Sequence, residues 1–309
     1  IKNNNQEIIG AFQVLNKLGG VFTKGDEDLL VAIGGSASIA LENAQLFEQQ
    51  KELYKEQKVL FESFIDTLAT SIDARDKITA GHSSRVKLYS MLIVDALDCD
   101  EKFKEIVEKA AILHDIGKIG IRDSVLQKEG KLTDEEYKHI QEHVKITHDI
   151  LEKIHTSEDF KQITEIACSH HEKFDGSGYY RHLSGENIPY GGRILAVADV
   201  FDAITSKRHY RDKMPIQNVI DILISGKDKH FDGKLVDTFL KIPTDKIIKV
   251  FLTENHSSFK DEDKELLSKY NLFDIHEFIV NDNATEEQKH IVDLFNFYYS
   301  GNRDKKEGC

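Results

Sequence analysis

The chain has 309 residues, and its 41 Lys or Arg against 54 Asp or Glu give a formal net charge of −13. This charge argues against a nucleic-acid polymer as the main partner, because phosphate backbones are bound by basic surfaces. A small phosphate ligand held by a few local Lys or Arg side chains is still compatible. No apolar run approaches the roughly 20 residues of a membrane span, and three well-separated cysteines indicate a reducing cytoplasm.

Residues 1–45 contain too few elements to bury a core. Ile8–Asn16 is apolar and β-branched and predicts one strand, and Thr23 or Asp26 is placed to cap the helix that follows. The segment IIGAFQVLNK, followed by FTKGDEDLLVAIGGSASIALENAQLF, resembles the C-terminal part of a GAF sensor domain. The resemblance implies a small α/β remnant of that domain.

Residues 39–72 contain no Pro and no Gly, which predicts an uninterrupted helix. Apolar residues recur at seven-residue spacing, and a mostly polar set fills the companion seam position: Ile39, Leu46, Leu53 and Leu60, then Asn43, Gln50, Gln57 and Phe64. This pattern is typical of a short parallel coiled coil whose register can shift. We expect residues 46–65 to form a linker helix that dimerises; the alternative is an amphipathic helix that packs on its own chain.

Histidines and carboxylates gather in the middle of the chain. His114 and Asp115 follow an apolar run, His170 and His171 precede a glycine-rich stretch, and Asp199 lies among apolar neighbours that leave its carboxylate needing a partner. Each feature alone has an ordinary explanation, such as a hydrogen-bonded turn. Together they supply N and O ligands without Cys, which suits Mn, Fe, Ni or Zn. Their number exceeds the needs of one tetrahedral zinc and favours two metals.

Residues 66–245 resemble the HD-GYP subgroup of the HD phosphohydrolase superfamily. The segments that carry the resemblance, in family order, are SIDARDKITAGHSSRV, AAILHDIGKIGI, GKLTDEEYKHIQEHV, HHEKFDGSGYY, LSGENIPYGGRILAVADVFDAITSKRHYR and FDGKLVDTFL. The resemblance implies a mainly α fold, a helical HD-domain bundle behind the long linker helix. Residues 246–309 are expected to be a C-terminal helical extension, in which Thr285 and Gln288 predict a capping box.

The resemblance also implies a set of metal ligands: His82, His114, Asp115, His143, His170, His171 and Asp199. His82, His114, Asp115 and Asp199 would hold one ion and the other three histidines a second, with Asp115 bridging. The residues alone do not distinguish His139 from His143, because the two lie four apart on one helix face. Ile78 stands where three-metal relatives carry Glu, so we expect two divalent ions, Fe or Mn, rather than three.

The activity that the resemblance implies is hydrolysis of cyclic di-GMP to linear pGpG, to GMP or to both. Lys118 and Asp115 are expected to act in catalysis, and Asp202 to orient a ligand or water or else to cap Lys207. The expected substrate contacts are Lys118, Arg208, Arg211, Gly178 and Tyr179. Two alternatives stay open: hydrolysis of another cyclic dinucleotide or phosphoester, and a receptor that binds cyclic di-GMP without turnover.

The chain departs from the family pattern at Tyr180, where Pro is expected after Gly178 and Tyr179. Val144 and Arg122 also replace a usual Pro. Losing a Pro frees the backbone φ angle and is expected to loosen the loop. This bears on substrate preference and on a diguanylate cyclase partner, which the family would bind at the loop of Gly178, Tyr179 and Tyr180. The overall expectation is a cytoplasmic, dimeric signalling enzyme.

Overall fold

The computed structural model describes residues 1–2, 6–75, 81–154, 158–206, 213–253 and 258–301. Across these ranges the regular secondary structure is helical, and β-pairing is limited to isolated bridges. The predicted mainly α class is therefore confirmed. The chain divides into two compact units, Ile1–Phe64 and Ile65–Cys309.

The predicted strand at Ile8–Asn16 is wrong. The β-pairing of this segment in the described residues is one isolated antiparallel bridge, between Lys2 and Ile8. A strand needs a neighbouring strand to hydrogen-bond with, and the described part of this unit supplies none. An α/β remnant is thus not supported. Thr23 does cap the next helix, since its hydroxyl accepts the Asp26 N–H at 3.4 Å and its own N–H donates to the Asp26 carboxylate at 2.7 Å.

Helix α1 (Lys24–Arg75) is continuous, as the lack of breakers within residues 39–72 predicts. Its seam leucines Leu46, Leu53 and Leu60 are 61%, 60% and 71% exposed, so the first unit does not cover them. One stretch of α1 is also long and apolar enough to cross a membrane by length and composition alone, which is weak evidence for a span.

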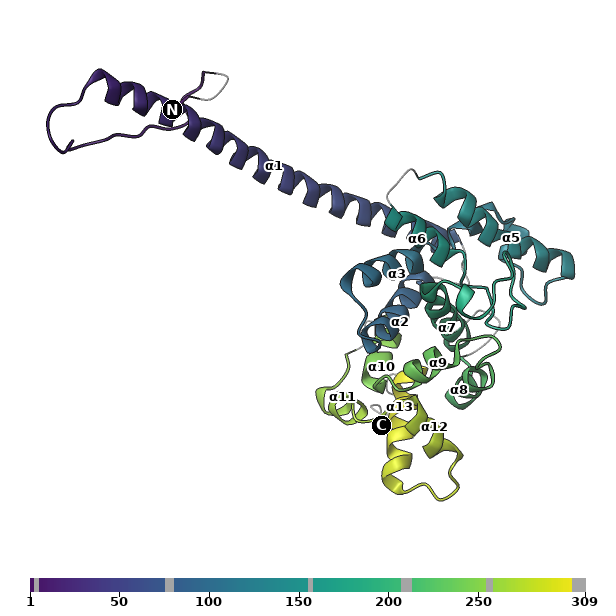
Figure 1. Ribbon diagram of the computed structural model, residues 1–309. Coiled ribbons are helices and arrows are strands. Elements are labelled where there is room, and N and C mark those ends of the chain that lie inside the picture. Colours follow the sequence, from purple (N-terminus) through teal and green to yellow (C-terminus); the bar gives the residue numbers. More distant parts are fainter. Residues whose placement is uncertain (3–5, 76–80, 155–157, 207–212, 254–257, 302–309) are drawn as a thin grey trace, which may run out of the picture. The chain divides into compact units, whose positions relative to one another are not determined.

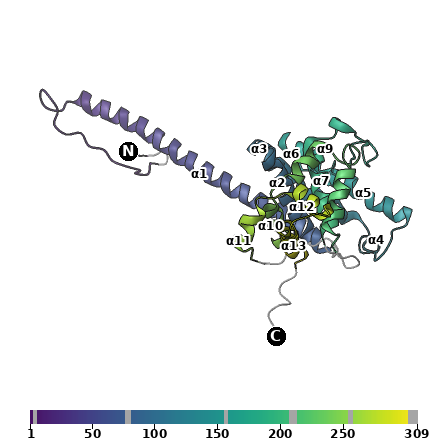
Figure 2. The same cartoon turned by 90° about the horizontal axis from the view of Figure 1, so that it is seen from below.

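In the second unit, α2 (His82–Ala96) packs against α3 (Glu101–Leu113) and α7 (Tyr190–Thr205), as Figure 1 shows. The other helices are η1 (Ile116–Gly120), α4 (Asp123–Leu126), α5 (Asp134–Leu151), α6 (Glu158–Ala167), η2 (Gly185–Asn187), α8 (Ile216–Ser225), α9 (Gly233–Leu240), α10 (Thr244–Thr253), α11 (Asp261–Leu267), α12 (Leu272–Val280) and α13 (Glu286–Ser300). Figure 2 shows the same unit from below, with α4 beside α5.

Local sequence explains where these helices begin. The Asp100 carboxylate accepts the Phe103 N–H at 2.9 Å and starts α3, and Thr133 opens α5 with a complete capping box. Pro189 and Pro215 stand directly before α7 and α8, where a missing N–H and a fixed φ are tolerated. Helices α5 and α7, which carry the predicted ligands His143 and Asp199, therefore have a defined start.

The core of the second unit forms around α7, which is buried along most of its length. Phe201 of α7 meets Tyr89 of α2 and Phe239 of α9 edge to face, with ring centroids 5.0 and 4.7 Å apart. Such aromatic pairs add to the free energy gained by burial alone. They hold α2 and α7, which carry the predicted ligands His82 and Asp199, against each other.

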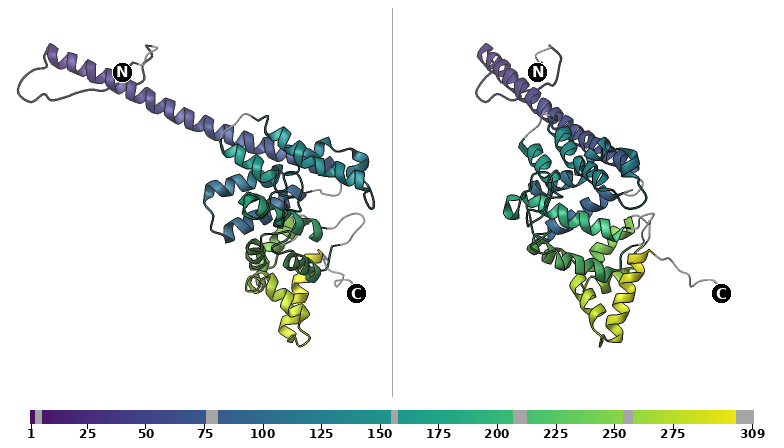
Figure 3. Two further views of the ribbon diagram at one scale, coloured as in Figure 1. Left: turned by 45° about the vertical axis from the view of Figure 1, so that its right-hand side comes forward. Right: turned by 90° about the vertical axis from the view of Figure 1, so that its right-hand side faces the viewer.

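The C-terminal extension packs on this core. The predicted capping box of α13 is confirmed, with Thr285 and Gln288 in reciprocal hydrogen bonds. Helix α13 contacts α10 and α12 (Figure 3), and the Tyr299 hydroxyl donates to the Met214 carbonyl at 2.6 Å. The described part of residues 246–309 is thus an integral layer of the second unit.

The turn that carries His114 and Asp115 is fixed to α5. The Thr147 hydroxyl donates to the His114 carbonyl at 3.1 Å and accepts the Gly117 N–H at 2.9 Å. A Cβ at Gly117 would lie 1.9 Å from the His143 carbonyl oxygen. Only glycine therefore allows η1 to lie this close to α5.

Substituting Gly117→Ala should lower the free energy of unfolding by at least about 1–3 kcal/mol, because overpacking forces the backbone apart. Thermal denaturation followed by circular dichroism measures the effect. Gly35→Ala is the matched control: its Cβ would meet nothing within 4 Å, and Ala is the better helix former. Equal melting temperatures for Gly117→Ala and the parent would show that the close approach is not required.

Candidate metal centre

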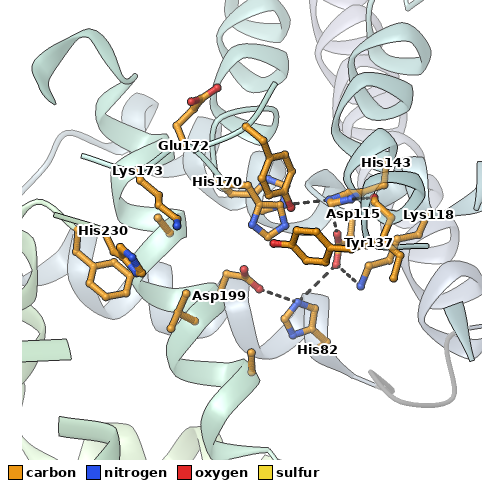
Figure 4. Close-up of a pocket in the computed structure, with 17 residues that line it drawn as sticks. His82, Asp115, Lys118, Tyr137, His143, His170, Glu172, Lys173, Asp199 and His230 are labelled. Atoms are coloured by element: carbon orange, nitrogen blue, oxygen red, sulfur yellow. Dashed lines mark hydrogen bonds and ion pairs between the residues drawn. The ribbon is translucent and has the colours of Figure 1, made fainter. Parts of the chain in front are cut away.

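The predicted ligands come from separate elements that meet at one pocket of about 370 Å³ (Figure 4). His82 begins α2, His114 and Asp115 lie between α3 and η1, His143 is on α5, His170 and His171 follow α6, and Asp199 is on α7. All of these except His114 line the pocket. The structure therefore brings together residues that are up to 117 positions apart in the chain.

Three of the histidines share one local arrangement. Each Nδ1 lies within hydrogen-bond distance of the main-chain carbonyl three residues earlier: His114 to Ala111 at 2.7 Å, His143 to Ile140 at 2.7 Å and His170 to Ala167 at 2.6 Å. A carbonyl can only accept, so Nδ1 carries the proton. In a neutral imidazole the other nitrogen, Nε2, then presents a lone pair.

These lone pairs converge. The Nε2 atoms of His143 and His170 are 3.4 Å apart, and without a cation two facing lone pairs repel. The Nε2 of His114 is buried and makes no hydrogen bond, although leaving a buried polar atom unsatisfied costs about 1–3 kcal/mol. A bound metal ion would remove both penalties, so the residues present fit a metal.

Asp115 faces two groups of nitrogens. One carboxylate oxygen, Oδ1, lies 3.3 Å from Nε2 of His143. The other, Oδ2, lies 3.3 Å from Nε2 of His114 and 3.6 Å from Nε2 of His82. The donor atoms of His143, His170 and His171 lie within 4.8 Å of one another, as do those of His82, His114 and Asp115. The carboxylate is thus positioned between two candidate metal sites.

Asp199 belongs on the His82 side. Its Oδ1 lies 3.1 Å from Nε2 of His82 and 4.0 Å from Nε2 of His114. It is carried by α7, which is buried along most of its length. Burial opposes ionisation, but hydrogen bonding to His82 outweighs it and holds the pKa of Asp199 far below its usual value. The carboxylate is therefore ionised at neutral pH.

Behind His82 lies a second layer that sequence analysis saw only in part. Asp202 Oδ2 is 2.7 Å from His82 Nδ1. Of the two roles expected for Asp202, orienting a ligand or capping Lys207, this contact fits the first. The partner Lys207 of the other role lies outside the described residues. Arg85, which sequence analysis missed, donates to Asp202 from Nε at 2.6 Å and from a terminal nitrogen at 3.0 Å. Its position three after His82, on one helix face, is the signal that could have found it.

The electrostatics differ between the two sides. Burial disfavours the charged form of His82, but hydrogen bonds to Asp199 and Asp202 prevail and raise its pKa to about 10. Burial, joined by neighbouring imidazoles, lowers the pKa of His143 and His170 and brings that of His171 to about 3. The carboxylate side therefore attracts positive charge, while the three-histidine side offers neutral ligands at neutral pH.

The loop that follows His171 is pressed against the ligands. A Cβ at Gly178 would lie 2.5 Å from the main-chain nitrogen of Lys173 and 2.7 Å from the main-chain carbonyl oxygen of His171. The Tyr179 ring lies over His171 with centroids 4.7 Å apart. The buried Glu172 carboxylate accepts the N–H groups of Arg181 and Leu183 at 2.8 and 3.0 Å, which closes the loop around it.

Tyr180 explains why Pro is absent from this loop. Its φ is +90°, whereas the proline ring fixes φ near about −65°. Its ring lies 5.8 Å from that of His148 on α5 and beside the Arg181 guanidinium. The loop therefore has a conformation that the usual Pro could not adopt, and side-chain contacts take its place.

The remaining predicted residues divide into two groups. Lys118 lines the pocket, with Nζ 2.8 Å from Asp115 Oδ2, whereas Ile78, Arg208 and Arg211 lie outside the described residues. Among the pocket residues that were not predicted from the sequence are Tyr137, Lys173 and His230. No motif or regular spacing in the sequence points to Tyr137 or His230. Lys173 lies within the segment HHEKFDGSGYY, but no role was expected for it.

Replacing Arg85 with Gln should weaken Mn²⁺ binding about 10–100-fold, because outer partners of a ligand histidine typically contribute that much. Without the guanidinium, Asp202 loses the donors that hold it against His82. Isothermal titration with Mn²⁺ measures the affinity. Lys87→Gln, on the same helix but paired with Glu108 at the surface, is the control. Equal affinities for both variants would refute a positioning role for Arg85.

Several known proteins have similar sequences over about two thirds of this chain. A 3′3′-cGAMP-specific phosphodiesterase 2 of Vibrio cholerae is 36% identical over 217 residues, 70% of this chain and 40% of that protein. A cyclic di-GMP phosphodiesterase of Vibrio cholerae is 35% identical, over 66% of this chain and 44% of that protein. A cyclic di-GMP phosphodiesterase of Thermotoga maritima is 36% identical, over 69% of this chain and 56% of that protein.

The chain thus spans about half the length of these curated relatives. The HD domain family matches residues 66–235, a range that includes every candidate ligand described above. On these grounds the chain belongs to the HD domain family.

Proposed function

We propose that this chain is a metal-dependent phosphodiesterase of the HD-GYP subgroup that hydrolyses cyclic di-GMP to pGpG, GMP or both. The observation that carries the proposal is the convergence of imidazole nitrogens on both sides of the Asp115 carboxylate in one pocket. Relatives named as cyclic di-GMP phosphodiesterases support the substrate class.

Two divalent ions, Fe or Mn, would occupy the centre. His82, His114 and Asp199 would hold one, and His143, His170 and His171 the other, with Asp115 shared. We expect no third ion, because Ile78 offers no ligand atom. When bound, such a pair neutralises the phosphodiester charge and lowers the pKa of bound water.

The chain's own groups would then orient the substrate. Lys118 Nζ, beside Asp115, is placed to contact a phosphate oxygen and offset the negative charge that grows during hydrolysis. Asp202 would keep His82 in the tautomer whose Nε2 faces the centre. Gly178 and Tyr179 would shape the pocket wall, and Arg208 and Arg211 would bind phosphate or guanine.

A second candidate substrate is 3′3′-cGAMP, which one relative is named for. The 36% identity to that relative supports this candidate. The altered loop at Tyr180, whose φ of +90° excludes the Pro of the HD-GYP pattern, keeps the substrate preference open. Rates with cyclic di-GMP, 3′3′-cGAMP and cyclic di-AMP under one metal condition would decide between them. Binding of cyclic di-GMP without cleavage by metal-loaded protein would instead support a receptor.

His139 and His143, which both lie on α5, allow a direct test of the ligand assignment. His143→Ala should lower kcat/KM for cyclic di-GMP by about 10³-fold or more, because a lost ligand removes charge stabilisation from the transition state. His139→Ala is the control, since its ring pairs with the surface carboxylate of Glu142 at 2.6 Å and does not line the pocket. Chromatography of the nucleotide products gives both rates.

Full activity in His143→Ala would refute the ligand assignment. A loss in His139→Ala as large as that in His143→Ala would show that the pair acts through the fold of α5 rather than through the metal.

We also propose that α1 dimerises through its seam leucines, that residues 1–45 derive from a GAF-like sensor, and that the enzyme acts in the cytoplasm. The proposed division is a GAF-like segment at 1–45, a linker helix at 46–65, a catalytic domain at 66–245 and a C-terminal extension at 246–309. A diguanylate cyclase would bind the loop at Gly178, Tyr179 and Tyr180.

The exposure of Leu46, Leu53 and Leu60 supports the dimer, because leucines at seven-residue spacing are normally covered by a second helix.

Sedimentation velocity at tens of micromolar should give a dimer for the parent chain and a monomer for Leu53→Glu, which puts a charge in the seam. Lys55→Glu adds the same side chain on the opposite helix face and should stay dimeric. A monomeric parent chain would contradict the proposed dimer. The exposed leucines of α1 would then have to be covered by something other than a second copy of this chain.

A further inference from the structure

One end of the pocket holds the ligands, and the other end carries cationic and aromatic groups that the metal centre does not use. In Figure 4, Lys173 and His230 lie on the side of the pocket away from His143 and Lys118. Both line the same cavity as the ligands, together with Phe231. A molecule seated at the metal centre and larger than one phosphate would therefore reach them.

The Lys173 ammonium is not committed elsewhere. Its two acidic neighbours are occupied by main-chain donors: Glu172 accepts the N–H groups of Arg181 and Leu183, and Asp175 accepts the Ser177 N–H at 2.9 Å. Within the described ranges Lys173 makes no ion pair, although it is half-buried. By contrast, Lys118 lies 2.8 Å from Asp115. Lys173 is thus a pocket cation that makes no salt bridge within the described residues, although the Asp175 carboxylate acts on it at longer range.

His230 is held next to Lys173 by the backbone. The Phe174 N–H donates to the His230 carbonyl at 3.2 Å, and the Asp175 N–H donates to the Lys229 carbonyl at 2.8 Å. These bonds tie the segment before α9 to the ligand loop. The His230 imidazole makes no hydrogen bond within the described residues and lines the cavity, so a ring N–H is available to an acceptor.

Part of the pocket wall, here called the α7 floor, is apolar. Ala196, Val200 and Ala203 of α7 line the pocket on the face that also carries Asp199. Low local polarity strengthens the attraction between a cation and an anion. It also makes an uncompensated negative charge costly, so an anion lying on this floor needs a cationic partner.

We propose that Lys173 and His230 form a second anion site, which binds the phosphodiester of a cyclic dinucleotide that is not being cleaved. This inference rests on the proposed function. A cyclic dinucleotide carries two phosphodiesters in one ring, each with one negative charge. With one at the metal centre, the other extends over the α7 floor to the ammonium of Lys173 and the ring N–H of His230. The site thereby selects ring-shaped substrates with two phosphates over small diesters with one.

The test compares two substrates on Mn-loaded protein. Cyclic di-GMP has two phosphodiesters and bis(p-nitrophenyl) phosphate has one. For Lys173→Met, the ratio of kcat/KM for cyclic di-GMP to that for the small diester should fall about tenfold or more, because a charge-assisted hydrogen bond is lost for one substrate only. His230→Leu should lower the same ratio about threefold, as loss of a neutral donor predicts.

Two variants serve as controls. Lys229→Met removes a neighbouring exposed ammonium that does not line the pocket and should leave the ratio unchanged. Lys173→Arg keeps the charge and should restore most of the preference for cyclic di-GMP.

An unchanged ratio in Lys173→Met, or an equal loss with both substrates, would overturn the second site while the parent protein still cleaves cyclic di-GMP. Failure of the proposed function looks different: the parent protein would cleave the small diester but no cyclic dinucleotide. That result would overturn both the substrate and the second site.

Discussion

Three hydrogen bonds from histidine Nδ1 groups to main-chain carbonyls fix the geometry on which the site depends. They join His114, His143 and His170 to the carbonyl three residues before each. Because the proton is held at Nδ1, each neutral ring presents the lone pair of its Nε2 toward the other candidate ligands. The direction of that lone pair then follows from the helix or helix end that carries the histidine. Positioning α3, α5 and α6 therefore positions the ligands.

The rest of the unit maintains these helix positions. The aromatic contacts of Phe201 hold α7 against α2 and α9, and the Thr147 hydroxyl fixes the turn at His114 to α5. Gly117 and Gly178 allow main chains to approach more closely than any side chain would permit. Overpacking or loosening at these contacts would move a lone pair as well as reduce stability.

The carboxylate side follows a different principle. Asp115, Asp199 and Asp202 are buried near one another, which would be strongly unfavourable without compensating charge. Arg85 compensates Asp202 and Lys118 compensates Asp115. Asp199 has His82 as its partner, and the raised pKa of His82 reports how strongly this side attracts positive charge. A divalent ion meets that demand better than a proton.

Sequence patterns predicted local features well and long-range ones only through family resemblance. The capping box at Thr285 and the uninterrupted α1 depend on neighbouring residues alone, so both could be read directly. The strand at Ile8–Asn16 failed because a strand depends on a partner that the pattern does not show. His139 and His143 share spacing and face, and only the packing of α5 turns one toward Glu142 and the other toward Asp115.

Residues that act through tertiary contacts were the hardest to find. Arg85 matters because Asp202, far along the chain, lies beside it. Lys173 matters because the fold places it in the wall of the same pocket as the ligands. Tyr180 shows the opposite case. The sequence flagged the missing Pro, but only its positive φ gives the reason. Such residues follow from geometry that the order of amino acids alone does not display.

The most direct test is the metal content per chain of protein purified without oxygen and supplied with Mn or Fe. Elemental analysis by mass spectrometry, set against protein concentration, gives the ratio. Lone pairs converging on both sides of Asp115 predict two ions per chain in the parent protein, and loss of both in Asp115→Ala. A single ion per chain, or two ions that persist in Asp115→Ala, would contradict a shared carboxylate between two metal sites.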